Sequence, residues 1–286
     1  MTGGFRAWWN GQPSDAVRRA RAERLAEPKP WSRDAQAARC PVTEKRLEWT
    51  ETSMRWCVRE FGLEAARRPV AAPGPGFVPA GWNGSEKQVR ALVGWVCGVM
   101  DVDPESFSVE FFRTPEGEPS RRRHAIGRYR RVGGRNIVEL DLREVGDPER
   151  LAGVVAHELG HKRLLGEPRR QRLPAEGEEM TDLVTVYLGM GVFTANGARR
   201  FTRAAQGWSA LPLGDLTDEM LSASTREGRS TVGYLTETEL GFALACRCRL
   251  RGETEPPAWA GSLHPGPRAA LLQGLRYLSA RRQDRT

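Results

Sequence analysis

Residues 154–161 read VVAHELGH, an HExxH pattern inside an apolar run that predicts a helix. His157 and His161 are four positions apart, so a helix brings both imidazoles to one face, one turn apart. This spacing lets both rings bind one Zn²⁺ ion, while Glu158 projects beside them to act on a water at the metal. The chain has only four histidines, so a chance HExxH is expected in well under roughly 1% of such sequences.

The competing interpretation of this segment is an amphipathic helix with an incidental charged face. Its leucines and valines would account for burial without any metal. They would not account for Gly160, because glycine inside a helix costs about 1 kcal/mol relative to alanine. We therefore expect another segment to pack closely against the helix at Gly160.

Composition favours a protein of the reducing cytoplasm. Five cysteines form no regular disulfide framework, and we expect Cys246 and Cys248 to be buried thiols. The longest apolar stretches, residues 91–100 and 183–195, are too short to span a bilayer. The first nine residues lack the apolar core of a signal peptide. We expect no membrane partner and a cytoplasmic location.

The net charge of +8 and the pI of about 9.7 come almost entirely from arginine. One interpretation is a nucleic-acid surface. The arginines are scattered along many segments, however, and a GC-rich coding sequence favours arginine over lysine. A diffuse positive charge affects solubility and steering more than it marks a binding site, so we do not expect nucleic acid to be the main partner.

The chain divides into an N-terminal extension, residues 1–84, and a larger domain, residues 85–286. Within the extension, helices are expected at about 14–25 and 43–61, the second ended by Gly62. Residues 69–84 are rich in proline and glycine and are typical of a linker or surface loop.

The larger domain is expected to be α+β, with a small, mostly antiparallel sheet and a largely helical remainder. Its first helix begins at a capping box, Ser85 to Gln88. Strands are expected at 107–111, 122–131 and 136–142, the last two joined by a Gly-Gly hairpin turn. The HExxH helix starts at Asp147 and ends near Gly166. Later helices are expected at about 176–195, 236–251 and 265–280.

A hydrolytic zinc site needs three protein ligands and one open position for water. No histidine follows His161 within residues 162–168, so we expect the third ligand to be a carboxylate on the next helix. The segment EEMTD, residues 178–182, provides one.

These residues resemble the gluzincin branch of the zinc metallopeptidases (zincins), and the chain is also similar to soluble bacterial proteins with an HExxH core. The resemblance covers roughly residues 105–195. It implies that Glu178 is the third ligand and that Asp182 accepts the second N–H of His157. It also implies that the strand 137–142 borders the substrate cleft. Glu179 and Glu176 remain alternative ligands, and Glu178 is favoured because it lies one helical turn from Asp182.

The expected function is a zinc-dependent endopeptidase that acts on a peptide or protein. Zn²⁺ would activate a water, and Glu158 would act as general base. Candidate donors to the oxyanion are Tyr234 and His264, with Tyr187 and His124 also open.

Two further hypotheses concern substrate and function. Arginines at 163, 169, 170 and 172 would bias the cleft towards acidic substrates. The alternative function is a non-catalytic zincin-fold scaffold that binds nucleic acid through its arginine-rich surface, although the intact Glu158 favours the peptidase.

Overall fold

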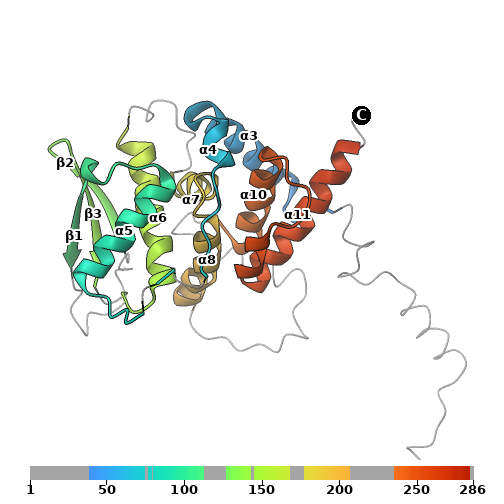
Figure 1. The fold of residues 1–286 in the computed structure, drawn as a ribbon. Coiled ribbons are helices and arrows are strands. Elements are labelled where there is room, and N and C mark those ends of the chain that lie inside the picture. The colour runs from blue at the N-terminus through green and yellow to red at the C-terminus, as the bar shows by residue number, and fades with distance from the viewer. Residues whose placement is uncertain are drawn as a thin grey trace, which may run out of the picture. The chain divides into compact units, whose positions relative to one another are not determined.

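The computed structural model describes residues 39–74, 77–78, 80–112, 127–142, 145–167, 177–206 and 235–283. The chain forms two compact units, Met1–Arg39 and Cys40–Thr286, and the elements below belong to the second. This unit is α+β and mostly helical, as expected from the sequence (Figure 1). The expected helix at 14–25 lies outside the described residues. None of the described helices combines the length and the apolar character needed to cross a bilayer.

The sheet has three strands in the order β1-β3-β2, where β1 is Ser108–Phe112, β2 is Gly127–Val132 and β3 is Arg135–Asp141. The β2–β3 hairpin turns through two glycines, Gly133 and Gly134, with φ of 56° and 83°. Both values are positive, as the tight hairpin turn requires. The first part of the expected strand 122–131, up to residue 126, lies outside the described residues.

One sequence-based prediction about the sheet is wrong. The sheet is mixed rather than mostly antiparallel, because β1 pairs in parallel with β3. The central strand of the described sheet is therefore β3, and β2 lies at one edge.

The helix α3, Glu44–Phe61, begins and ends as expected, with Gly62 at a φ of 79° after its last turn. Met54 is buried on its inner face, and Leu47, Val58 and Phe61 pack against the core. The short helix α4, Leu63–Arg67, follows. α3 packs on the helices α7, Gly177–Tyr187, and α10, Glu237–Leu250.

The helix α5, Glu86–Met100, starts where expected, but its predicted capping box does not form. Gln88 Oε1 accepts the N–H of Asn83 instead, and Asn83 Oδ1 accepts the N–H of Ser85. Asn83 therefore replaces Ser85 as the partner of the Gln88 side chain. A 3₁₀ turn, η1 at Pro104–Ser106, leads into β1.

The helix α6, Pro148–Leu165, contains the HExxH residues and packs on β2 and β3 (Figure 1). Asp147 caps its N-terminus by accepting the N–H of Arg150 at 3.0 Å, and Gly166 follows its last residue. Both ends agree with the sequence-based prediction.

The single helix expected at 176–195 is wrong: the structure has α7, Gly177–Tyr187, and α8, Gly191–Gln206. The chain turns at Gly189, whose φ of 104° is disfavoured for residues with a side chain. The carbonyl of Gly189 accepts the N–H of Ala71, and Arg247 Nε donates to the carbonyl of Tyr187. These partners satisfy groups that the helix end leaves free. The apolar run at residues 183–195 is buried.

The C-terminal part is a pair of helices, α10 at Glu237–Leu250 and α11 at Pro265–Gln283, joined through η4 at Ala258–Ser262. Thr236 and Glu239 form a capping box at the start of α10. All five cysteines are free thiols. Cys246 and Cys248 are buried, as predicted, and burial raises the pKa of each.

Candidate metal centre

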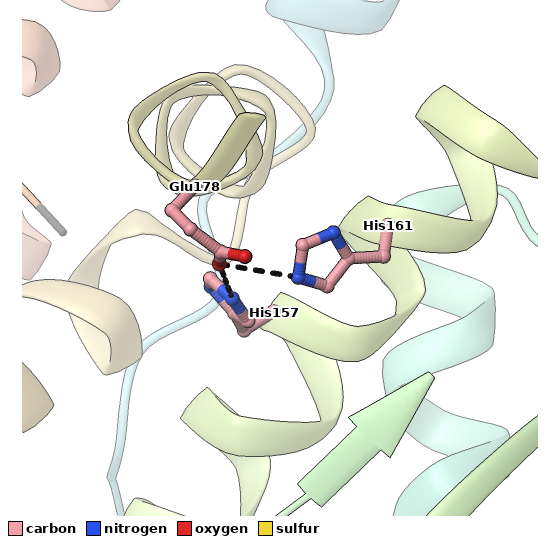
Figure 2. A group of neighbouring side chains, drawn as sticks. All are labelled: His157, His161 and Glu178. Carbon is pink, nitrogen blue, oxygen red and sulfur yellow. Dashed lines mark hydrogen bonds and ion pairs between the residues drawn. The ribbon is translucent and has the colours of Figure 1, made fainter. Parts of the chain in front are cut away.

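Two imidazoles and one carboxylate converge where α6 packs on α7. His157 Nε2 lies 3.0 Å from Glu178 Oε2, and His161 Nε2 lies 3.3 Å from the same oxygen (Figure 2). The helical spacing explains this arrangement, since it brings both rings to one face of α6. Within the described residues, these three form the one group of histidine, cysteine and acidic side chains whose ligand atoms, all within 4.8 Å of one another, could hold a metal.

Asp182 contacts the first imidazole, His157, at Nδ1, the ring nitrogen that does not face Glu178. Its Oδ1 lies 2.9 Å from His157 Nδ1, and its Oδ2 accepts the N–H of Leu235 at 2.9 Å. Burial alone would lower the pKa of His157, but the hydrogen bonds to Asp182 and Glu178 outweigh burial and raise it to about 10. The same contacts determine the pKa of Glu178. Burial raises this pKa, but hydrogen bonds from the two histidines outweigh burial and hold it far below its usual range.

Glu158 lies on the side of α6 that meets β2 and is 7% exposed. Its carboxylate accepts the backbone N–H of Tyr129, and burial, although opposed by the neighbouring histidines, raises its pKa. The strand can come this close only because residue 127 is a glycine. A Cβ there would lie 2.9 Å from Glu158 Cγ and 2.7 Å from Val154 Cγ1.

The close approach of a second segment at Gly160 is confirmed, and that segment is α7. A Cβ on Gly160 would lie 2.8 Å from Thr181 Cγ2 and 3.2 Å from the Thr181 carbonyl oxygen. The absence of a side chain thus allows the helix that bears Glu178 to meet the helix that bears the histidines.

The structure separates the candidate third ligands. Glu178 faces the histidines, whereas Glu179 forms a salt bridge of 2.8 Å with Arg46 on α3. Arg46 also pairs with Glu239 in the capping box of α10. Glu176 lies outside the described residues.

The two candidate oxyanion donors within the described residues, Tyr187 and His264, form hydrogen bonds with groups outside the cluster. The hydroxyl of Tyr187 donates to the carbonyl of Gly62 at 2.6 Å. His264 precedes α11, where its backbone N–H donates to Asn196 Oδ1 at 2.8 Å. Tyr234 and His124 lie outside the described residues.

Arg163, expected to favour acidic substrates, is held by other groups. It donates to the carbonyl of Asp101 at 2.8 Å and lies 3.4 Å from Glu167. The arginines at 169, 170 and 172 are outside the described residues.

Sequence reasoning missed three residues that shape this centre, namely Gly127, Thr181 and Arg46. Gly160 was a usable signal for Thr181, because a glycine inside a buried helix predicts a close neighbour. Nothing in the local sequence connects Arg46 with Glu179, which lies 133 positions away.

Comparisons of the chain with protein families, curated proteins and solved structures found no match. Two imidazole nitrogens and one carboxylate oxygen form a set suited to a divalent metal of the zinc type, with a buried carboxylate next to it in the chain.

Proposed function

We propose that this protein is a gluzincin-like zinc peptidase whose metal is held by His157, His161 and Glu178. The observation that carries the proposal is the convergence of both Nε2 atoms on one oxygen of Glu178. Calcium and magnesium prefer sites made of oxygen ligands, whereas two imidazoles with one carboxylate suit zinc. Asp182 supports the same assignment, because a carboxylate behind a ligating histidine fixes its tautomer and raises its basicity.

Zinc bound by these residues would supply Lewis acidity, which polarises a carbonyl and lowers the pKa of water to about 7. Glu158 would accept a proton from the attacking water and deliver it to the leaving amine. Burial raises the pKa of Glu158, and this favours the first transfer, because a carboxylate with a higher pKa is a stronger base. The Tyr129 N–H fixes the orientation of the carboxylate.

The position of β2 supports a peptide substrate. Within the described part of the sheet, β2 pairs on one side only, with β3. An extended peptide can add to such an edge through main-chain hydrogen bonds. A peptide bound there would pass close to Glu158, whose carboxylate contacts the same strand.

The decisive test compares wild type with Glu158→Gln and His161→Ala. The full chain should bind one zinc per molecule and cleave members of a diverse peptide library. Glu158→Gln should keep its zinc and lose about 10²- to 10⁴-fold in kcat/KM, whereas His161→Ala should lose the zinc itself. A zinc-loaded wild type that cleaves no peptide would reject the peptidase and favour the non-catalytic alternative.

A further inference from the structure

We infer that Thr181 is a positioning residue for His161. Its hydroxyl fixes the tautomer of the second imidazole, as the Asp182 carboxylate does for the first. Thr181 Oγ1 lies 3.2 Å from His161 Nδ1, on the side of the ring away from Glu178. The inference rests on the proposed function, because it concerns how the ring presents Nε2 to a metal.

The direction of this hydrogen bond follows from the number of protons available. A threonine hydroxyl has a single proton, and Thr181 donates it to the carbonyl of Gly177 at 2.7 Å. The oxygen can then only accept from the ring, so Nδ1 of His161 must carry the proton. When zinc is bound, the lone pair of the other nitrogen, Nε2, is then available to the metal.

Close packing holds the hydroxyl in this place. Thr181 is fully buried, and its methyl group lies where a side chain at Gly160 would be. Gly160 directly precedes His161, so the contact between α6 and α7 sets the distance from the ring to the hydroxyl. A larger residue at 160 would move the two helices apart and lengthen the bond.

The two imidazoles are therefore anchored by consecutive residues of α7 with different chemistry. His157 has a carboxylate behind it, and His161 has a neutral hydroxyl. Hydrogen bonds to an ionised partner are roughly twice as strong as those between neutral groups. The loss of the Thr181 hydroxyl should thus weaken zinc binding, but less than the loss of the Asp182 charge.

The test uses the full chain with Thr181→Val, which keeps the branched shape without the hydroxyl, and Thr181→Ser, which keeps the hydroxyl. Thr194→Val is the matched control, because it removes another buried threonine hydroxyl, one that bonds to Thr185 and the Met190 carbonyl. Competition with a chromogenic chelator should show zinc binding about tenfold weaker in Thr181→Val. Thr181→Ser and Thr194→Val should remain within about threefold of wild type, within the spread expected of a substitution that leaves the ligand anchors intact.

Nitrogen-15 NMR of the zinc-loaded wild type gives a second readout that needs no variant. It should show His161 protonated at Nδ1 and zinc-bound at Nε2. Wild-type zinc affinity in Thr181→Val, or coordination through Nδ1, would overturn the inference and leave the peptidase proposal standing. Conversely, zinc bound with the expected tautomer but without peptide cleavage would reject the peptidase and keep the role of Thr181.

Discussion

His157 Nδ1 and Asp182 Oδ1 lie 2.9 Å apart, and both side chains are buried. The second oxygen of Asp182 accepts the N–H of Leu235, two residues before α10. One carboxylate thus connects the HExxH helix with the start of a helix more than 50 positions later in the chain. The orientation of the first imidazole depends on the docking of α10 as well as on α6 and α7.

Asp182→Asn should weaken zinc binding by about 10- to 100-fold. The amide oxygen can still accept the Leu235 N–H, which leaves the NH₂ group facing His157. That group donates to Nδ1 and forces the proton onto Nε2, the nitrogen needed for the metal. Chelator competition measures the loss, and unchanged affinity would show that the carboxylate does not select the tautomer.

Glu178→Gln and Glu179→Gln form a matched pair of adjacent substitutions with different expected results. Glu178→Gln should lose bound zinc, because it removes the charged ligand oxygen. Glu179→Gln should keep zinc but lose about 1–2 kcal/mol of stability, because it weakens a charged hydrogen bond to the mostly buried Arg46. Metal analysis and chemical denaturation measure the two effects. Zinc loss in Glu179→Gln alone would mean that Glu179, and not Glu178, is the metal ligand.

The stability of the metal-free protein should fall as pH rises from about 7 to 10. His157 has a folded-state pKa of about 10, above the unfolded value of about 6.5. Its proton therefore stabilises the fold fully below pH 6.5, and this contribution is lost as pH rises through the folded pKa. Denaturation across this range in wild type and His157→Gln isolates the effect. A constant difference between the two proteins would contradict it.

Gly160→Ala should destabilise the protein by about 1–3 kcal/mol, because the new methyl group overlaps the Thr181 side chain between α6 and α7. Gly94→Ala is the control. Gly94 lies on the exposed side of α5 with open space around it, so alanine should stabilise by up to about 1 kcal/mol through helix propensity. Thermal or chemical denaturation of both variants checks the opposite signs. Stabilisation by both would mean that the helices can separate without cost.

Gly127→Ala should lower kcat/KM by about 100-fold with zinc retained, because the added methyl group displaces the Glu158 carboxylate from β2. Gly146→Ala, where a Cβ meets nothing within 4 Å, is the control and should keep wild-type activity. Steady-state kinetics and metal analysis separate a misplaced base from a lost metal. Full activity in Gly127→Ala would mean that Glu158 works without its contact to the strand.

The sequence predicted those parts of the centre that depend on helical spacing. The i,i+4 relation placed His157 beside His161, and the same relation linked Glu178 with Asp182. The proximity of these two helical segments was expected from a family resemblance, and the structure brings them together. Capping was predicted correctly at Asp147, where an N-cap aspartate precedes a proline, but not at Ser85, where Asn83 provides a competing side chain.

The features that were missed depend on tertiary contacts. The uninterrupted apolar run predicted one long helix, yet buried partners from distant segments stabilise the break at Gly189. The parallel pairing of β1 with β3 could not be derived from a hairpin signal, which reports only on neighbouring strands. The role of Thr181 depends on its contacts with α6, and the residues around Thr181 in the sequence do not indicate those contacts.

The salt bridges of Arg46 determine where the chain can be cut for laboratory work. An expressed fragment that starts at residue 85 lacks α3 and leaves Glu179 and Glu239 facing each other without their shared cation. A fragment that starts at residue 40 keeps this cation and the whole of the second compact unit. In the shorter fragment, α7 and its residue Glu178 would lack the contact with Arg46. Crystals or metal affinities obtained with that fragment would therefore describe a less firmly held α7.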